Sequence, residues 1–123
     1  MSVPAQVLLR GLPEFVRAVT QGDTIKVAVY ARPYDAAVFP DDTDVEFRLR
    51  VVPAGEDAEE ATYEGEGQMT VVSTSEQYAT IELAAAGRWH FRAEIDGDYV
   101  GSDEASIMVP ESAFAPADPS PDP

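Results

Sequence analysis

Three groups of residues in this sequence have side chains that could do chemistry: a single histidine, several acidic clusters and a set of alternating arginines. His90, the one histidine, stands between Arg88 and Arg92. Acid–base or nucleophilic catalysis by His90 would need a positioned partner and a pocket, and no nucleophile-elbow or zinc-ligand spacing surrounds any Ser, Asp or Glu. We therefore predict a solvated strand position for His90, no catalytic residue and no enzymatic activity.

The acidic clusters have the oxygen ligands that calcium prefers. They are Asp41-Asp42-Thr43-Asp44, Asp96-Gly97-Asp98 and Asp103-Glu104, and none of them has the spacing of an EF-hand loop. Hydrated turns explain the same residues, because Asp-Gly pairs favour hairpins. The glycines also lack the phosphate-cradling spacing that precedes a helix. We predict no cofactor and no metal, and leave calcium at these loops as the alternative.

The arginines alternate along two segments, so that Arg48 and Arg50 share the outward face of one strand and Arg88, His90 and Arg92 that of another. If the two strands are neighbours, four of the eight Lys and Arg residues form a basic strip on one sheet. One interpretation is cross-strand pairing with Glu46 and Glu94. The other is a protein interface, in which the strip of Arg48, Arg50, Arg88, His90 and Arg92 receives the acidic loop of Asp41, Asp42 and Asp44 from another copy or another protein.

The length, composition and net charge of the chain limit the classes of protein that are possible. The chain has 123 residues, no cysteine and a formal net charge of −15. That charge opposes contact with nucleic acid or anionic membranes, and the absence of cysteine excludes disulfides. No signal-like segment and no run of 18 apolar residues occurs, so we expect a soluble, unprocessed protein of one domain.

Strand-like patterns occupy most of the chain. The clearest run from 45 to 51 and from 89 to 95, and Asp96-Gly97-Asp98 then turns the chain into a returning strand that ends at Pro110. A bulge near Gly101 would reconcile an inward Val100 with an inward Ala105. We also expect a hairpin at 14–31, strands at 68–73 and 78–83, and a tight corner at 84–86.

These patterns predict an all-β fold, an immunoglobulin-like antiparallel β-sandwich of seven to eight strands. Residues 14–114 form the sandwich, residues 1–13 an N-terminal arm or edge strand, and residues 115–123 a proline-rich, disordered tail. The apolar faces of the strands predict a core of Ile25, Val27, Val29, Val45, Phe47, Leu49, Ile81, Leu83, Trp89, Phe91, Ile95, Ile107 and Val109.

The last 28 residues of the sandwich carry a more specific pattern. It reads Gly87-x-Trp89-x-Phe91-Arg92, then a short turn, then Val109-x-x-Ser112-x-Phe114. The pattern resembles the ending of small immunoglobulin-like virion proteins of tailed bacteriophages, and Gly22-Asp23 resembles their opening turn. The loop at 32–44 and the acidic segment at 56–67 depart from that family as elaborations.

The resemblance implies a non-enzymatic virion protein, a capsid decoration, head–tail junction or tail component, assembled in the host cytoplasm. Its partners would be other virion proteins and copies of itself, with no nucleic acid, membrane or small-molecule substrate. The alternative is a free-standing carbohydrate- or surface-binding module, which requires exposed aromatic residues gathered at one site. The candidates for that site are Tyr30, Tyr34, Phe39, Tyr63, Tyr78 and Tyr99.

Overall fold

A computed structural model describes residues 2–13 and 19–112 of the chain. Within these ranges the chain forms eight β-strands and one helical turn. The elements are β1 (Val3–Arg10), β2 (Thr24–Pro33), β3 (Val45–Val52), β4 (Ala61–Glu64), α1 (Gly65–Gln68), β5 (Thr70–Ser73), β6 (Glu76–Glu82), β7 (Gly87–Gly97) and β8 (Tyr99–Val109). Among the described residues, no helix is long and apolar enough to cross a membrane.

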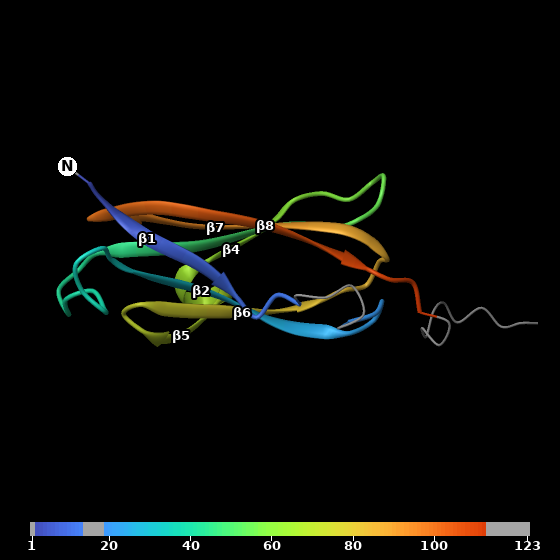
Figure 1. Cartoon of the computed structure of the whole chain (residues 1–123), viewed down its shortest axis with the longest axis horizontal. Helices are drawn as coiled ribbons and strands as arrows, with labels where there is room; N and C mark the ends of the chain where they lie inside the picture. Colours follow the sequence, from blue (N-terminus) through green and yellow to red (C-terminus); the bar gives the residue numbers. More distant parts are fainter. Residues whose placement is uncertain (1, 14–18, 113–123) are drawn as a thin grey trace, which may run out of the picture.

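The strands form one curled sheet in the order β4-β3-β7-β8-β1-β2-β6-β5. The curl brings its two halves face to face, with β4, β3, β7 and β8 in one layer and β2, β6 and β5 in the other (Figure 1). This is the layering of an immunoglobulin-like sandwich, so the predicted all-β class is confirmed. The sheet is mixed rather than purely antiparallel, because β1 runs parallel to β8.

β1 joins the two layers. We predicted an arm or an edge strand at residues 1–13, but β1 pairs with β8 on one side and with β2 on the other, so it is not an edge strand. Gly101 explains the close approach, because a Cβ at this position would lie 2.7 Å from the Ala5 carbonyl oxygen. Asp103 accepts a hydrogen bond from the Leu9 N–H at 2.9 Å and fixes β1 further along β8.

Two other local predictions differ from the structure. The register of β7 with β8 runs without a shift from Gly87 opposite Val109 to Ile95 opposite Gly101, so no bulge occurs there and Val100 faces outward. Residues 14–18 of the predicted 14–31 hairpin and the predicted tail at 115–123 lie outside the described residues. β2 itself pairs with β1 and β6.

The core fills the space between the layers. Of the thirteen residues predicted there, all but Ile25 and Val45 are buried, and those two are half-buried against the same cluster. The Trp89 indole N–H donates to the Ala85 carbonyl at 2.9 Å, so the corner at 84–86 satisfies a buried donor. Phe39 lies in a loop and is also fully buried against the ring of Tyr99, with 4.7 Å between the ring centroids.

Candidate functional site

The predicted basic strip assembles on the outer face of the β3–β7–β8 layer. β3 and β7 are antiparallel neighbours, with Arg48 opposite Glu94, Arg50 opposite Arg92, and Val52 opposite His90. β8 continues the face on the other side of β7, placing Ser106 opposite His90 and Met108 opposite Arg88. The strip therefore exists as a set of neighbours on one sheet.

Glu94 is the hub of this face. Its carboxylate oxygens lie 3.2 Å from Arg48, 3.1 Å from Arg50 and 2.6 Å from Arg92, and its side chain is only 16% exposed. Burial by itself raises the pKa of Glu94, but hydrogen bonds from Arg92, Arg50 and Arg48 outweigh it and hold the pKa below its ordinary value. Three guanidinium groups thus converge on one carboxylate.

Further glutamates surround the hub. Arg50 also pairs with Glu60, Arg48 with Glu64, and Arg92 with Glu104. The hydrogen bond between Arg50 and Glu60 is the largest cause of the raised pKa of Arg50 and of the lowered pKa of Glu60. The pKa of Arg92 is raised most by its hydrogen bond with Glu94 and next by that with Glu104. The cross-strand pairing predicted as an alternative is therefore present, although through Glu94 rather than Glu46, and it neutralises three of the four arginines.

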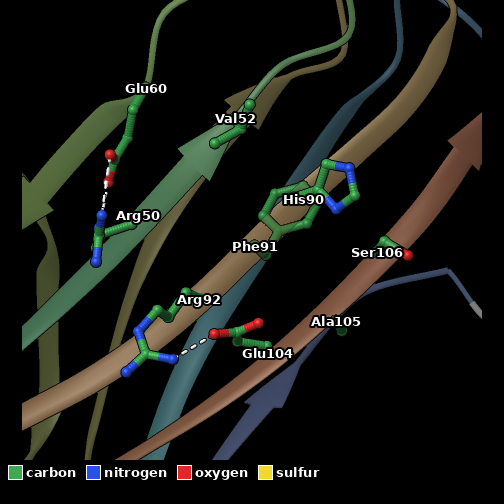
Figure 2. A pocket seen from close by; sticks show the side chains of 9 residues that line it. All are labelled: Arg50, Val52, Glu60, His90, Phe91, Arg92, Glu104, Ala105 and Ser106. Atoms are coloured by element: carbon green, nitrogen blue, oxygen red, sulfur yellow. Dashed lines mark hydrogen bonds and ion pairs between the residues drawn. The ribbon is translucent and has the colours of Figure 1, made fainter.

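A groove of about 590 Å³ crosses this face. Figure 2 shows Arg50 with Glu60 on one side, Arg92 with Glu104 on the other, and the His90 ring between β3 and β8. Beyond these pairs, Arg88 donates to the Ser106 hydroxyl at 3.2 Å and forms no ion pair with any described residue. Exposed Val52 and Met108 flank the end of the strip that Arg88 and His90 occupy.

The acidic loop predicted as the counterpart of the strip lies elsewhere on its own molecule. Asp41 and Asp42 are exposed in a turn closed by the Thr43 N–H, which donates to the Pro40 carbonyl at 3.0 Å. The Asp44 N–H donates to Asp98 at 2.8 Å and ties the loop to the β7–β8 turn. Among residues 2–13 and 19–112, no group of three or more acidic or histidine side chains is placed to hold a metal ion.

The opposite outer face holds a cluster that the sequence reasoning missed. We call it the tyrosine face: Arg10 lies 4.8 Å from the ring centroid of Tyr30, and Lys26 lies 4.2 Å from that of Tyr78. Ala28 points to the same side, opposite both Arg10 and Tyr78, and is nevertheless buried. The alternation of Lys26, Ala28 and Tyr30 with the core residues of β2 could have indicated this cluster.

The six aromatic residues considered for a binding module do not gather at one site. Phe39 is buried, and Tyr63 and Tyr99 pack against the core. Tyr34 is exposed on a loop, while Tyr30 and Tyr78 share the tyrosine face, where a cation lies over each ring. Sugar rings stack on open aromatic faces, so this arrangement does not favour a carbohydrate site.

No family model matches the chain, and no curated protein matches it.

Proposed function

We propose that the protein is a non-enzymatic structural or accessory component of a tailed-bacteriophage virion, located on the head, the head–tail junction or the tail. It acts through protein–protein contacts with other virion proteins and with copies of itself. It takes no cofactor and no small-molecule substrate, and it binds neither nucleic acid nor membrane.

The β7–β8 hairpin is the observation that carries this proposal. Trp89 and Phe91, two residues of the virion-protein pattern, are buried neighbours with ring centroids 6.4 Å apart. Gly87 has φ of 126°, and a Cβ there would lie 2.8 Å from the Ala54 Cβ. Gly87, Trp89 and Phe91 thus have structural roles in one hairpin of an immunoglobulin-like sandwich, which supports the resemblance to small virion proteins of that fold, while Phe114 of the pattern lies outside the described residues.

The character of the outer face supports protein contacts rather than small-molecule binding. The groove over β3, β7 and β8 is open to solvent and is lined mainly by charged and polar groups. Small-molecule sites are lined predominantly by apolar and aromatic side chains, whereas protein interfaces are enriched in arginine and methionine. Arg88, His90, Val52 and Met108 form such a mixed surface at one end of the strip.

The test uses the phage whose genome encodes this chain. Purified particles are analysed by mass spectrometry, alongside particles from a variant with an early stop codon in this gene. We expect the protein in particles that carry the intact gene, and altered stability or assembly of particles that lack it. Particles free of the protein after purification, from cells that express it, would contradict the proposed function.

A further inference from the structure

The segment from 34 to 44, the projecting loop, is long but firmly anchored. Its Phe39 side chain is buried, the Phe39 N–H donates to the Ser75 hydroxyl at 3.1 Å, and the Phe39 carbonyl accepts from Thr74 at 3.3 Å. The Arg32 guanidinium donates to the Ala36 carbonyl at 3.1 Å and closes the base of the loop. A loop held in this way loses little conformational entropy when it binds a partner.

The anchored loop presents apolar and acidic side chains together. Tyr34 is 68% exposed and Val38 is 53% exposed, although both are large and apolar. Asp41 and Asp42 are exposed in the same loop and form no ion pair with a described residue. The loop projects from one end of the sandwich, between β2 and β3 (Figure 1). Anchored apolar groups beside carboxylates suit a surface of aromatic and cationic residues.

The tyrosine face is a surface of that kind around Arg10 and Lys26, although Glu76 also lies on it, opposite Tyr30. Arg10 and Lys26 form no ion pair with any residue that the structure describes, although the chain has 23 acidic residues to pair with. The strip on the other face differs, because its Arg48, Arg50 and Arg92 already have carboxylate partners. Two cations over tyrosine rings match the arginine- and tyrosine-rich composition of binding hot spots.

We propose that the projecting loop of one copy docks on the tyrosine face of a second copy, with Asp41 and Asp42 against Arg10 and Lys26. This rests on the proposed function, in which copies of the protein contact one another. The loop lies far from Lys26 of its own chain. Lys26 and Tyr34 are eight residues apart along an extended segment, a span of about 27 Å, and the loop points away from it.

The loop and the tyrosine face are different surfaces of the chain. One loop docked on one face leaves a free loop and a free face on the pair, so the contact extends into a ring or a filament, unless two copies exchange loops about a two-fold axis and stop at a dimer.

Sedimentation velocity of the full chain over a range of concentrations, at about 150 mM salt, tests the contact. We expect the average sedimentation coefficient to rise with protein concentration as copies associate. The face variant Arg10→Glu/Lys26→Glu and the loop variant Asp41→Lys/Asp42→Lys should each weaken it at least about tenfold, because like charges then meet. An equimolar mixture of the two variants should associate again, because the reversed face of one variant attracts the reversed loop of the other. One chain with all four substitutions should associate for the same reason.

A matched variant controls for charge alone. Glu56→Lys/Asp57→Lys reverses the charge of another exposed acidic loop and should not change the association. If a reversed variant has a lowered melting curve, Arg10→Gln/Lys26→Gln and Asp41→Asn/Asp42→Asn replace it, with a smaller loss of association expected.

A wild-type chain that stays monomeric up to about 1 mM, or reversed variants that associate like wild type, would overturn the contact. The outcome of this experiment can be distinguished from the outcome of the test of the proposed function. A chain found in particles but monomeric in solution would contradict this contact alone, whereas a chain that associates but is absent from particles would contradict the virion function alone.

Discussion

At the scale of single residues, Glu94 holds together the ion pairs on the outer face of β3 and β7. A mostly buried carboxylate is costly unless it is paired, and here three arginines pair with it at 2.6–3.2 Å. The pKa of Glu94 is lowered in the folded state. Glu94 therefore stabilises the fold at pH values above its ordinary pKa of 4.5, and this stabilisation is lost as the pH falls below 4.5.

Glu94→Gln tests this hub. At pH 7 we expect the variant to lose about 1–3 kcal/mol of unfolding free energy, because the hydrogen bonds to charged groups weaken. Denaturant titrations at pH 7 and pH 3 should show the difference from wild type shrinking in acid, because the lowered pKa of folded Glu94 makes its stabilisation fall as the pH falls. Glu46→Gln, on the same face and without an ion pair in the described chain, is the control. An equal loss at both pH values would exclude an electrostatic origin.

Gln77 is the opposite case, a buried polar side chain that is poorly satisfied. It is 9% exposed, and its Oε1 accepts no hydrogen bond from any described residue. Methionine has a similar shape without the unpaired carbonyl, so Gln77→Met should raise the unfolding free energy by about 1 kcal/mol. Thermal melts compare it with Gln68→Met, which removes an acceptor that the Glu64 N–H uses at 2.8 Å and should not stabilise. A loss of stability in Gln77→Met would mean that the amide has a structural role.

At the scale of elements, the sequence largely predicts which segments form strands, but it does not predict which strands lie next to each other in the sheet. The alternation of Trp89, Phe91 and Ile95 fixes an inward face, and the structure buries all three. Periodicity says nothing about which strand lies beside which, so the position of β1 between β8 and β2 had no signal in residues 1–13. The pairing of Arg48 with Glu94 was foreseen because both residues lie on outward faces, but the convergence of three arginines depends on the β3–β7 register.

Gly101→Ala probes the junction of β1 with β8. The added Cβ would meet the Ala5 carbonyl oxygen at 2.7 Å and the Val7 side chain at 2.9 Å, so β1 must move. Crowding of this kind costs about 1–3 kcal/mol, and we expect that loss in equilibrium unfolding. Ser102→Ala, exposed on the same strand, should change stability by less than about 0.5 kcal/mol. A neutral Gly101→Ala would mean that β1 does not pack tightly on β8.

The distribution of charge gives the two outer faces different characters at the scale of the whole molecule. One face holds a network in which Arg48, Arg50 and Arg92 are neutralised by Glu60, Glu64, Glu94 and Glu104. The other holds Arg10 and Lys26 over tyrosine rings without carboxylate partners among the described residues. In a chain of net charge −15, long-range repulsion keeps copies apart unless specific contacts hold them, so assembly is expected to depend on such local complementary surfaces.

Counting copies of the protein in purified phage particles tests the central claim most directly. Isotope-labelled peptides from this chain and from the major capsid protein give the ratio of the two proteins by mass spectrometry. A virion component held by repeated contacts predicts several copies per particle, in a ratio that stays constant through successive purifications. A ratio below one copy per particle, or one that falls with each purification step, would contradict the account.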